Sequence, residues 1–267
     1  MEDDAAVLLH GGWSRPLGSV HRGVVRAVLD DVLSRDDVLG VMLAGSIVRG
    51  EGGPTSDLDV YVVVSSPWRQ RRQLLLDGVP VEVFINPPWT IRSYFADEAK
   101  DGAPSTAHML ATGVVLYARD GTLEGLRDEA RHILAQGPAA LTDEELTQRC
   151  YFLVDLSEDA DDVRENDPDA LAFVLPMLVE RAVALLYARA RRWLPKPKRL
   201  PTDLEGFDPD AAALLRAYLH EPDLLRRYSL ACALVERAIA PRPRRFFSWD
   251  SAPEEVPTKR GSGESTN

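Results

Sequence analysis

Two carboxylates stand two residues apart in this sequence, just before an apolar run. Asp57 and Asp59 flank the start of residues 58–64, which read as a buried strand. Because side chains at i and i+2 of a strand share one face, both carboxylates would meet at one point, and that suits a hard divalent cation. Upstream, the turn at Gly45-Ser46 offers backbone N–H groups and a hydroxyl to an anion. A cation site beside an anion cradle predicts phosphoryl or nucleotidyl transfer.

A third carboxylate stands in the strand predicted at residues 79–85. Glu82 is a lone charge within an alternating apolar pattern, which burial alone does not explain. Other elements must position these groups: a helix over residues 17–36, a short buried strand at 38–44 and a Gly/Pro loop at 51–55. Residues 68–76 are basic, and their secondary structure is ambiguous. The pattern of residues 89–117 predicts several short helical segments followed by a short strand at 114–117.

The second half of the chain predicts helices. Thr142 and Glu145 form a capping box before a helix that runs to about residue 165. Three acidic residues each precede a proline suited to the first helical position, and helices would follow at Pro168, Pro209 and Pro222. Residues 251–267 lack apolar side chains to bury, so we expect them to be disordered.

The motif residues together resemble the signature of a known family. Gly45-Ser46, Arg49-Gly50 and Ser56-Asp57-Leu58-Asp59 are similar to the signature of the nucleotidyltransferase superfamily, whose fold is shared with DNA polymerase beta. Glu82 fits the position of the family's third carboxylate. The resemblance covers about the first half of the chain. The second half resembles the helical bundle of aminoglycoside nucleotidyltransferases in its architecture only.

The resemblance implies a fold, domain limits and roles for particular residues. The expected fold is an α+β nucleotidyltransferase domain with a mixed sheet flanked by helices at 1–122, an all-α bundle at 123–245 and a tail at 246–267. Asp57 and Asp59 would hold Mg²⁺, and Glu82 would complete the metal site, act as general base, or do both. The nucleotide would be bound by Gly45, Ser46, Arg49, Ser56 and Lys198.

Each of these assignments has a structural alternative. The Asp pair could cap a helix or end a solvated strand, and Glu82 could occupy an exposed strand face. Arg49 could be a surface arginine, and Lys198 a solvated loop lysine. A further group lies at helical spacing, and we read it as a solvated helix face rather than a cradle for a cationic substrate: Asp155, Glu158, Asp159 and Asp162.

Composition limits the class of protein and its partners. The chain has 267 residues and a formal net charge of −11, which opposes nucleic-acid binding and would attract a polycationic small molecule. No uninterrupted apolar run approaches the roughly 20 residues of a membrane span, and the acidic start lacks the features of a signal peptide, so we expect a cytoplasmic protein without a membrane partner. Cys150 and Cys232 are expected to be buried thiols. A monomer and a homodimer both stay open.

The sequence thus predicts a magnesium-dependent nucleotidyltransferase. It would transfer a nucleoside monophosphate, AMP from ATP or the equivalent group from another NTP, to a hydroxyl of a small molecule such as an aminoglycoside-like antibiotic. Two alternatives stay open. One is a toxin–antitoxin type of nucleotidyltransferase that modifies a protein or tRNA, and the other is a nucleotide-binding protein without catalysis.

Overall fold

A computed structural model describes residues 19–50, 52, 56–245, 247–251 and 253 of the chain. The chain forms two compact units. Unit 1 comprises Met1–Ala139 with Arg191–Pro195, and unit 2 comprises Ala140–Ala190 with Lys196–Asn267. The predicted domain limits at residues 122 and 245 stay predictions, because compact units are not the same as functional domains.

Unit 1 contains a mixed five-stranded sheet. Its two central strands, β2 and β4, run parallel, and the other neighbouring pairs are antiparallel. The parallel pair requires a crossover, and β3 supplies it at the edge of the sheet before β4 returns beside β2. The strands, in the order β3-β4-β2-β1-β5, are β1 (Val38–Ala44), β2 (Leu58–Val64), β3 (Gln70–Leu76), β4 (Val79–Asn86) and β5 (Val114–Ala118).

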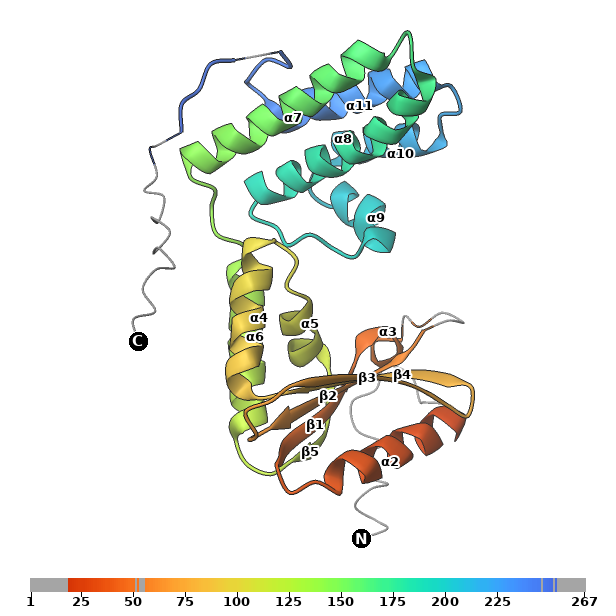
Figure 1. The fold of residues 1–267 in the computed structure, drawn as a ribbon, viewed down its shortest axis with the longest axis vertical. Coiled ribbons are helices and arrows are strands. Elements are labelled where there is room, and N and C mark those ends of the chain that lie inside the picture. The colour runs from red at the N-terminus through yellow and green to blue at the C-terminus, as the bar shows by residue number, and fades with distance from the viewer. Residues whose placement is uncertain (1–18, 51, 53–55, 246, 252, 254–267) are drawn as a thin grey trace, which may run out of the picture. The chain divides into compact units, whose positions relative to one another are not determined.

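Helices cover both faces of this sheet (Figure 1). On one face, α2 (Ser19–Leu33) buries Val24, Val25, Val28 and Val32 against the β-branched side chains of the central strands. The other face carries α4 (Pro88–Lys100), α5 (Ser105–Thr112) and α6 (Thr122–Gln136). The near-continuous apolar pattern of β1 and β2 follows from burial on both faces.

Most of the elements predicted for the first half are present, and two short ones had not been predicted. The basic stretch that the sequence left ambiguous is β3, whose side chains alternate between exposed and half-buried positions. Such alternation is typical of an edge strand, but its charges masked the strand pattern. The one-turn helix α3 (Gly45–Val48) follows directly from β1.

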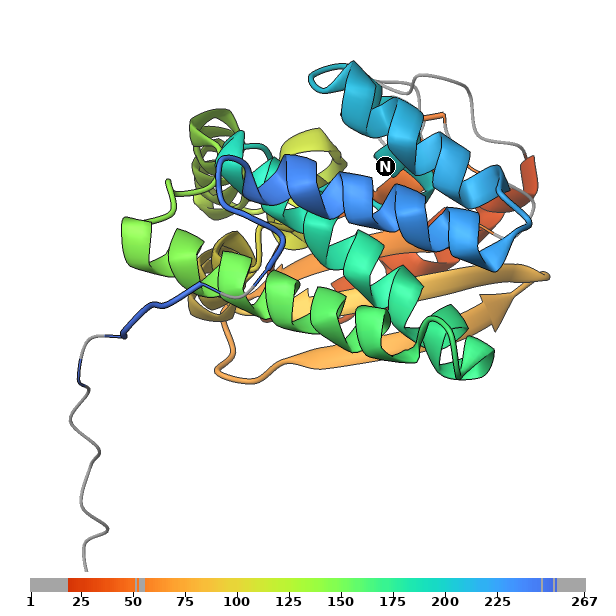
Figure 2. The ribbon, with the colours of Figure 1, turned by 90° about the horizontal axis from the view of Figure 1, so that it is seen from above.

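Unit 2 is all-helical. Figure 2 shows α7, α8 and α11 side by side, with α10 packed against α11. The predicted capping box is confirmed, since the Thr142 hydroxyl accepts from the Glu145 N–H while the Glu145 carboxylate accepts from the Thr142 N–H. The helices are α7 (Asp143–Val163), α8 (Pro168–Arg189), α9 (Leu200–Glu205), α10 (Pro209–His220) and α11 (Leu224–Ile239), with the 3-10 turn η1 at Pro197–Arg199.

Two of the three predicted proline starts are confirmed, and one is wrong. Pro168 and Pro209 occupy first helical positions behind the N-caps Asp167 and Asp208. Pro222 lies outside its helix, because Asp223 caps α11 by accepting the Arg226 N–H, and this sets the start at Leu224. The cap at Asp223 therefore outweighs the proline signal.

Other sequence expectations have mixed outcomes. Cys150 and Cys232 are free and buried, as predicted.

Among the described residues, α8 is long and apolar enough to cross a membrane, but half of its most apolar window is buried within the protein, which makes this weak evidence. The predicted cytoplasmic location stays a prediction. Of the tail at 246–267, which was expected to be disordered, the structure describes residues 247–251 and 253, and the rest lies outside the described residues.

Candidate functional site

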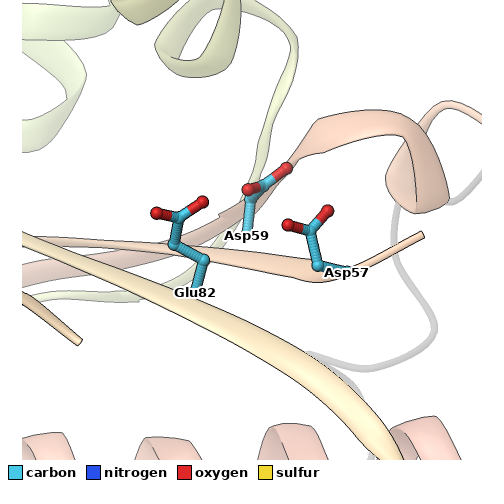
Figure 3. Close-up of side chains that lie close together, drawn as sticks. All are labelled: Asp57, Asp59 and Glu82. Carbon is cyan, nitrogen blue, oxygen red and sulfur yellow. The ribbon is translucent and has the colours of Figure 1, made fainter. Parts of the chain in front are cut away.

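Three carboxylates meet at the end of the central strands. Asp57 stands directly before β2, Asp59 is the second residue of β2, and Glu82 lies on β4. Because β2 and β4 run parallel with Asp59 in register with Glu82, their side chains lie side by side on the same face. Figure 3 shows the three carboxylates gathered in one small region. One oxygen from each lies within 4.8 Å of the others.

This cluster fits a divalent cation. Carboxylate oxygens are the hard donors that Mg²⁺ and related ions prefer, and the site offers three of them. Asp57 and Asp59 are half-buried, and Glu82 is buried with 7% of its surface exposed. Three like charges this close repel one another unless a cation balances them. The predicted convergence of Asp57, Asp59 and Glu82 is therefore present, while their assignment as metal ligands stays a prediction.

Gly45 makes room for one of these carboxylates. It has a φ of 84°, a left-handed conformation that favours glycine, and it follows Ala44, the residue paired with Asp59 across β1 and β2. A Cβ built at Gly45 would lie 1.9 Å from Asp59 Oδ2. The glycine of the motif is thus required by both its backbone conformation and the space that Asp59 occupies.

The two serines of the motif approach each other beside this glycine. Ser46 lies in α3, and its hydroxyl donates to the Ser56 hydroxyl at 3.2 Å, across ten residues of sequence. Ser56 immediately precedes Asp57, so the serine pair lies next to the carboxylate cluster. The structure therefore brings Gly45, Ser46 and Ser56 together, as the sequence predicted, and their contact with a nucleotide stays a prediction.

Arg49 and Lys198 differ in how the structure locates them. Arg49 is the half-buried C-cap of α3. Burial lowers the pKa of the His108 imidazole on α5, and the Arg49 charge lowers that pKa further. Lys198 is exposed in η1 and belongs to unit 2, whereas the other predicted site residues belong to unit 1. Its role stays a prediction.

Sequence reasoning missed one residue that contacts the cluster. Arg71 of β3 donates a hydrogen bond from Nε to Glu82 Oε1 and forms an ion pair with it. The hydrogen bond to Glu82 raises the pKa of Arg71, and the charges of Asp59 and Asp57 raise it further. The signal would have been the alternation of Arg71 and Gln73 with Arg72 and Leu74, had the stretch been recognised as β3.

Comparisons with known proteins agree with this geometry. Residues 25–91 match the family model of the nucleotidyltransferase domain, and this span contains all three carboxylates and the Gly-Ser turn. The chain carries a nucleotidyltransferase domain. The predicted membership of the nucleotidyltransferase superfamily is confirmed, and the domain is that of a nucleotidyltransferase enzyme.

Solved structures extend the likeness to the fold. A nucleotidyltransferase-like protein from Exiguobacterium sibiricum has a similar structure, with a TM-score of 0.50 and 12% sequence identity. The match covers 81% of this chain and 73% of that one. At this identity the likeness supports the fold alone. A search among curated proteins finds no match to this nucleotidyltransferase.

Proposed function

We propose that this nucleotidyltransferase transfers AMP from ATP to a hydroxyl of a small molecule, with Mg²⁺ held by Asp57, Asp59 and Glu82. The observation that carries the proposal is the convergence of three carboxylate oxygens within 4.8 Å beside the Gly45-Ser46 turn. Bound magnesium would neutralise the phosphate charge and favour deprotonation of the acceptor hydroxyl. The donor set consists of hard oxygens, as this ion requires.

The order of the strands supports a direction for the reaction. The end of β1 with Gly45 and Ser46 lies on one side of β2, and Glu82 on β4 lies on the other. In phosphoryl transfer the attacking and leaving oxygens are roughly in line. With the outgoing pyrophosphate near Gly45 and Ser46, the acceptor would approach from the β4 side. There Glu82 would be placed to accept its proton.

The proposed acceptor is a cationic small molecule of the aminoglycoside type. The net charge of −11 supports it, since an acidic protein attracts a polycation. A second candidate is an anionic acceptor such as tRNA, and one observation favours it. Arg71 is exposed on the edge strand and contacts Glu82, on the proposed acceptor side, and Arg69 is exposed just before that strand.

One reaction series tests the activity and both acceptors. The protein is incubated with Mg²⁺ and ATP plus an aminoglycoside panel, bulk tRNA or purified proteins, and each acceptor is examined by mass spectrometry. A gain of one nucleoside monophosphate on an aminoglycoside supports the first proposal. If tRNA or a protein gained a nucleoside monophosphate and no aminoglycoside did, the aminoglycoside proposal would be replaced by a macromolecular acceptor. ATP binding without pyrophosphate release on any acceptor would favour the non-catalytic alternative.

The metal assignment has its own variant. Asp59→Asn keeps the size of the side chain and removes a charge, so we expect transfer to fall by more than about 100-fold, beyond the usual cost of losing an outer-shell partner. Asp77→Asn is the matched control, because Asp77 lies in an exposed turn at a φ of 49° that asparagine tolerates. Equal activity of the two variants, with normal folding of both, would contradict the assignment.

A further inference from the structure

Arg71 lies against the carboxylate cluster without belonging to the family motif. It stands on the edge strand β3, and 64% of its side chain is exposed, whereas 10% of the side chain of its partner Glu82 is exposed. A buried carboxylate is thus held by a guanidinium that reaches it from the rim of the site. Charge-assisted hydrogen bonds of this kind are stronger than neutral ones and fix the geometry of the acceptor group.

Strand register explains how Arg71 reaches Glu82. The β3–β4 pairing sets Arg71 opposite Phe84 and Gln73 opposite Glu82. Arg71 is therefore the diagonal neighbour of Glu82 on the same face, a separation that long side chains span. Arg72, the next residue, points to the other face and bonds Asp31 of α2 at 2.6 Å. Only one of the two adjacent arginines can therefore act on the site.

The guanidinium of Arg71 also contacts an aromatic ring, that of Phe84. Its central carbon lies 5.1 Å from the centre of the Phe84 ring, within the range of a cation–π contact. Phe84 in turn stacks on Tyr61 at 5.7 Å with an interplanar angle of 16°. Tyr61 is buried, and its hydroxyl accepts from Asn86 Nδ2 at 3.2 Å. Arg71 therefore contacts a buried aromatic stack as well as Glu82.

We propose that Arg71 is a positioning residue that holds the Glu82 carboxylate in the orientation needed to complete the divalent-cation site. The proposal rests on the proposed function, because it needs the three carboxylates to bind a cation. Arg71 does not contact the cation. It engages Oε1 of Glu82, and the carboxylate has a second oxygen that can bind a cation. Outer-shell partners of metal ligands act in this way, and losing one costs about 10- to 100-fold in metal affinity or activity.

Mn²⁺ binding measured by electron paramagnetic resonance, without nucleotide or acceptor, tests the proposal. Arg71→Met keeps an apolar chain over Phe84 and removes the hydrogen bond, and we expect Mn²⁺ affinity to fall by about 10-fold or more. Arg72→Met is the matched control, with the same charge removed from the same strand, and we expect its affinity to equal that of the wild type. Thermal unfolding of both variants shows whether they fold.

A double-mutant cycle with Glu82→Gln separates action through Glu82 from a general effect of charge. If Arg71 acts through Glu82, Arg71→Met lowers Mn²⁺ affinity in the wild type and has no further effect in Glu82→Gln. In activity assays the Arg71→Met defect should shrink as Mn²⁺ is raised to saturation. The Michaelis constant for the acceptor should stay unchanged.

Distinct results would overturn the proposal. Tighter Mn²⁺ binding by Arg71→Met would mean that Arg71 competes with the cation for Glu82. A defect confined to the Michaelis constant for the acceptor would make Arg71 an acceptor-binding residue, and equal affinities of Arg71→Met and Arg72→Met would give it no role. Failure of the proposed function is distinguishable, because the wild-type protein itself would then bind no Mn²⁺ or transfer no nucleotide.

Discussion

At the scale of single residues, the site combines groups that the sequence identified with one that it did not. Asp57, Asp59 and Glu82 were predicted from charge placed in apolar strands, and the structure brings them together. Arg71 was missed because its contact depends on the pairing of β3 with β4, which no local pattern encodes. Motif chemistry is therefore visible in sequence, whereas partners supplied by strand register are not.

Gly45 offers a sharp prediction at this scale. Gly45→Ala places a methyl group against Asp59 and strains the backbone, so we expect a loss of about 1–3 kcal/mol in unfolding free energy together with weaker Mn²⁺ binding. Gly78→Ala is the control, because Gly78 has a similar φ of 79° but no atom within 4 Å of a built Cβ. Gly78→Ala should lower the free energy of unfolding and leave Mn²⁺ binding unchanged. Unchanged metal binding in Gly45→Ala would show that Asp59 can move away.

At the scale of elements, local signals predicted the existence and type of an element better than its exact limits. The strand runs at 38–44 and 58–64 and the capping box of α7 were read correctly, because burial and capping are local in sequence. The start of α11 was misplaced, since two competing signals, Pro222 and Asp223, stand side by side. The edge strand β3 was not predicted, because about half of its side chains face solvent and its first half is polar and basic.

Asp208 carries a prediction about helix α10. Its Oδ1 accepts from the Ala211 N–H at 3.0 Å and pairs with Arg237 of α11 at 2.6 Å. Asp208→Ala should therefore lower the free energy of unfolding by about 1–2 kcal/mol, through the lost cap and a partly exposed ion pair. Asp208→Asn keeps a cap and should cost less. Equal losses of the two variants in urea unfolding would contradict a contribution of the cap, because asparagine retains the cap and lacks only the charge.

The same residue gives a dependence on pH. Burial raises the pKa of Asp208, but the hydrogen bonds from Arg237 and Ala211 outweigh it, and the net pKa is below the ordinary value of 3.8. A lowered carboxyl pKa stabilises the folded state above pH 3.8, and this contribution is lost as the pH falls through the folded-state pKa. The stability difference between wild type and Asp208→Asn should therefore shrink below pH 3.8 in urea unfolding. A constant difference would contradict the assignment.

At the scale of the whole molecule, the two compact units divide the predicted nucleotide contacts. Gly45, Ser46, Arg49 and Ser56 belong to unit 1, and Lys198 belongs to unit 2. Unit 1 has its own apolar clusters on both faces of its sheet, so calorimetry should resolve more than one unfolding transition. Saturation with Mg²⁺ and ATP at 100 times the dissociation constant should stabilise unit 1 by about 2.7 kcal/mol.

Lys198 can be tested in the same experiment. If its ammonium binds the triphosphate, Lys198→Ala should reduce the stabilisation by ATP, since one charged contact is lost. Lys196→Ala is the matched control, two residues earlier in the same connection. Identical ATP responses of the two variants would leave Lys198 a solvated loop lysine.

The turn between β3 and β4 has a consequence for how this enzyme tolerates changes in length. Asp77 and Gly78 both have positive φ and join Leu76 directly to Val79, which is the two-residue hairpin connection. One inserted residue that slid β3 past β4 by a single position would turn Arg71 to the opposite face of the sheet. Every motif residue would be intact, yet Glu82 would lose its partner. A homologue whose longer turn shifts β3 by one residue would therefore need another cation for Glu82.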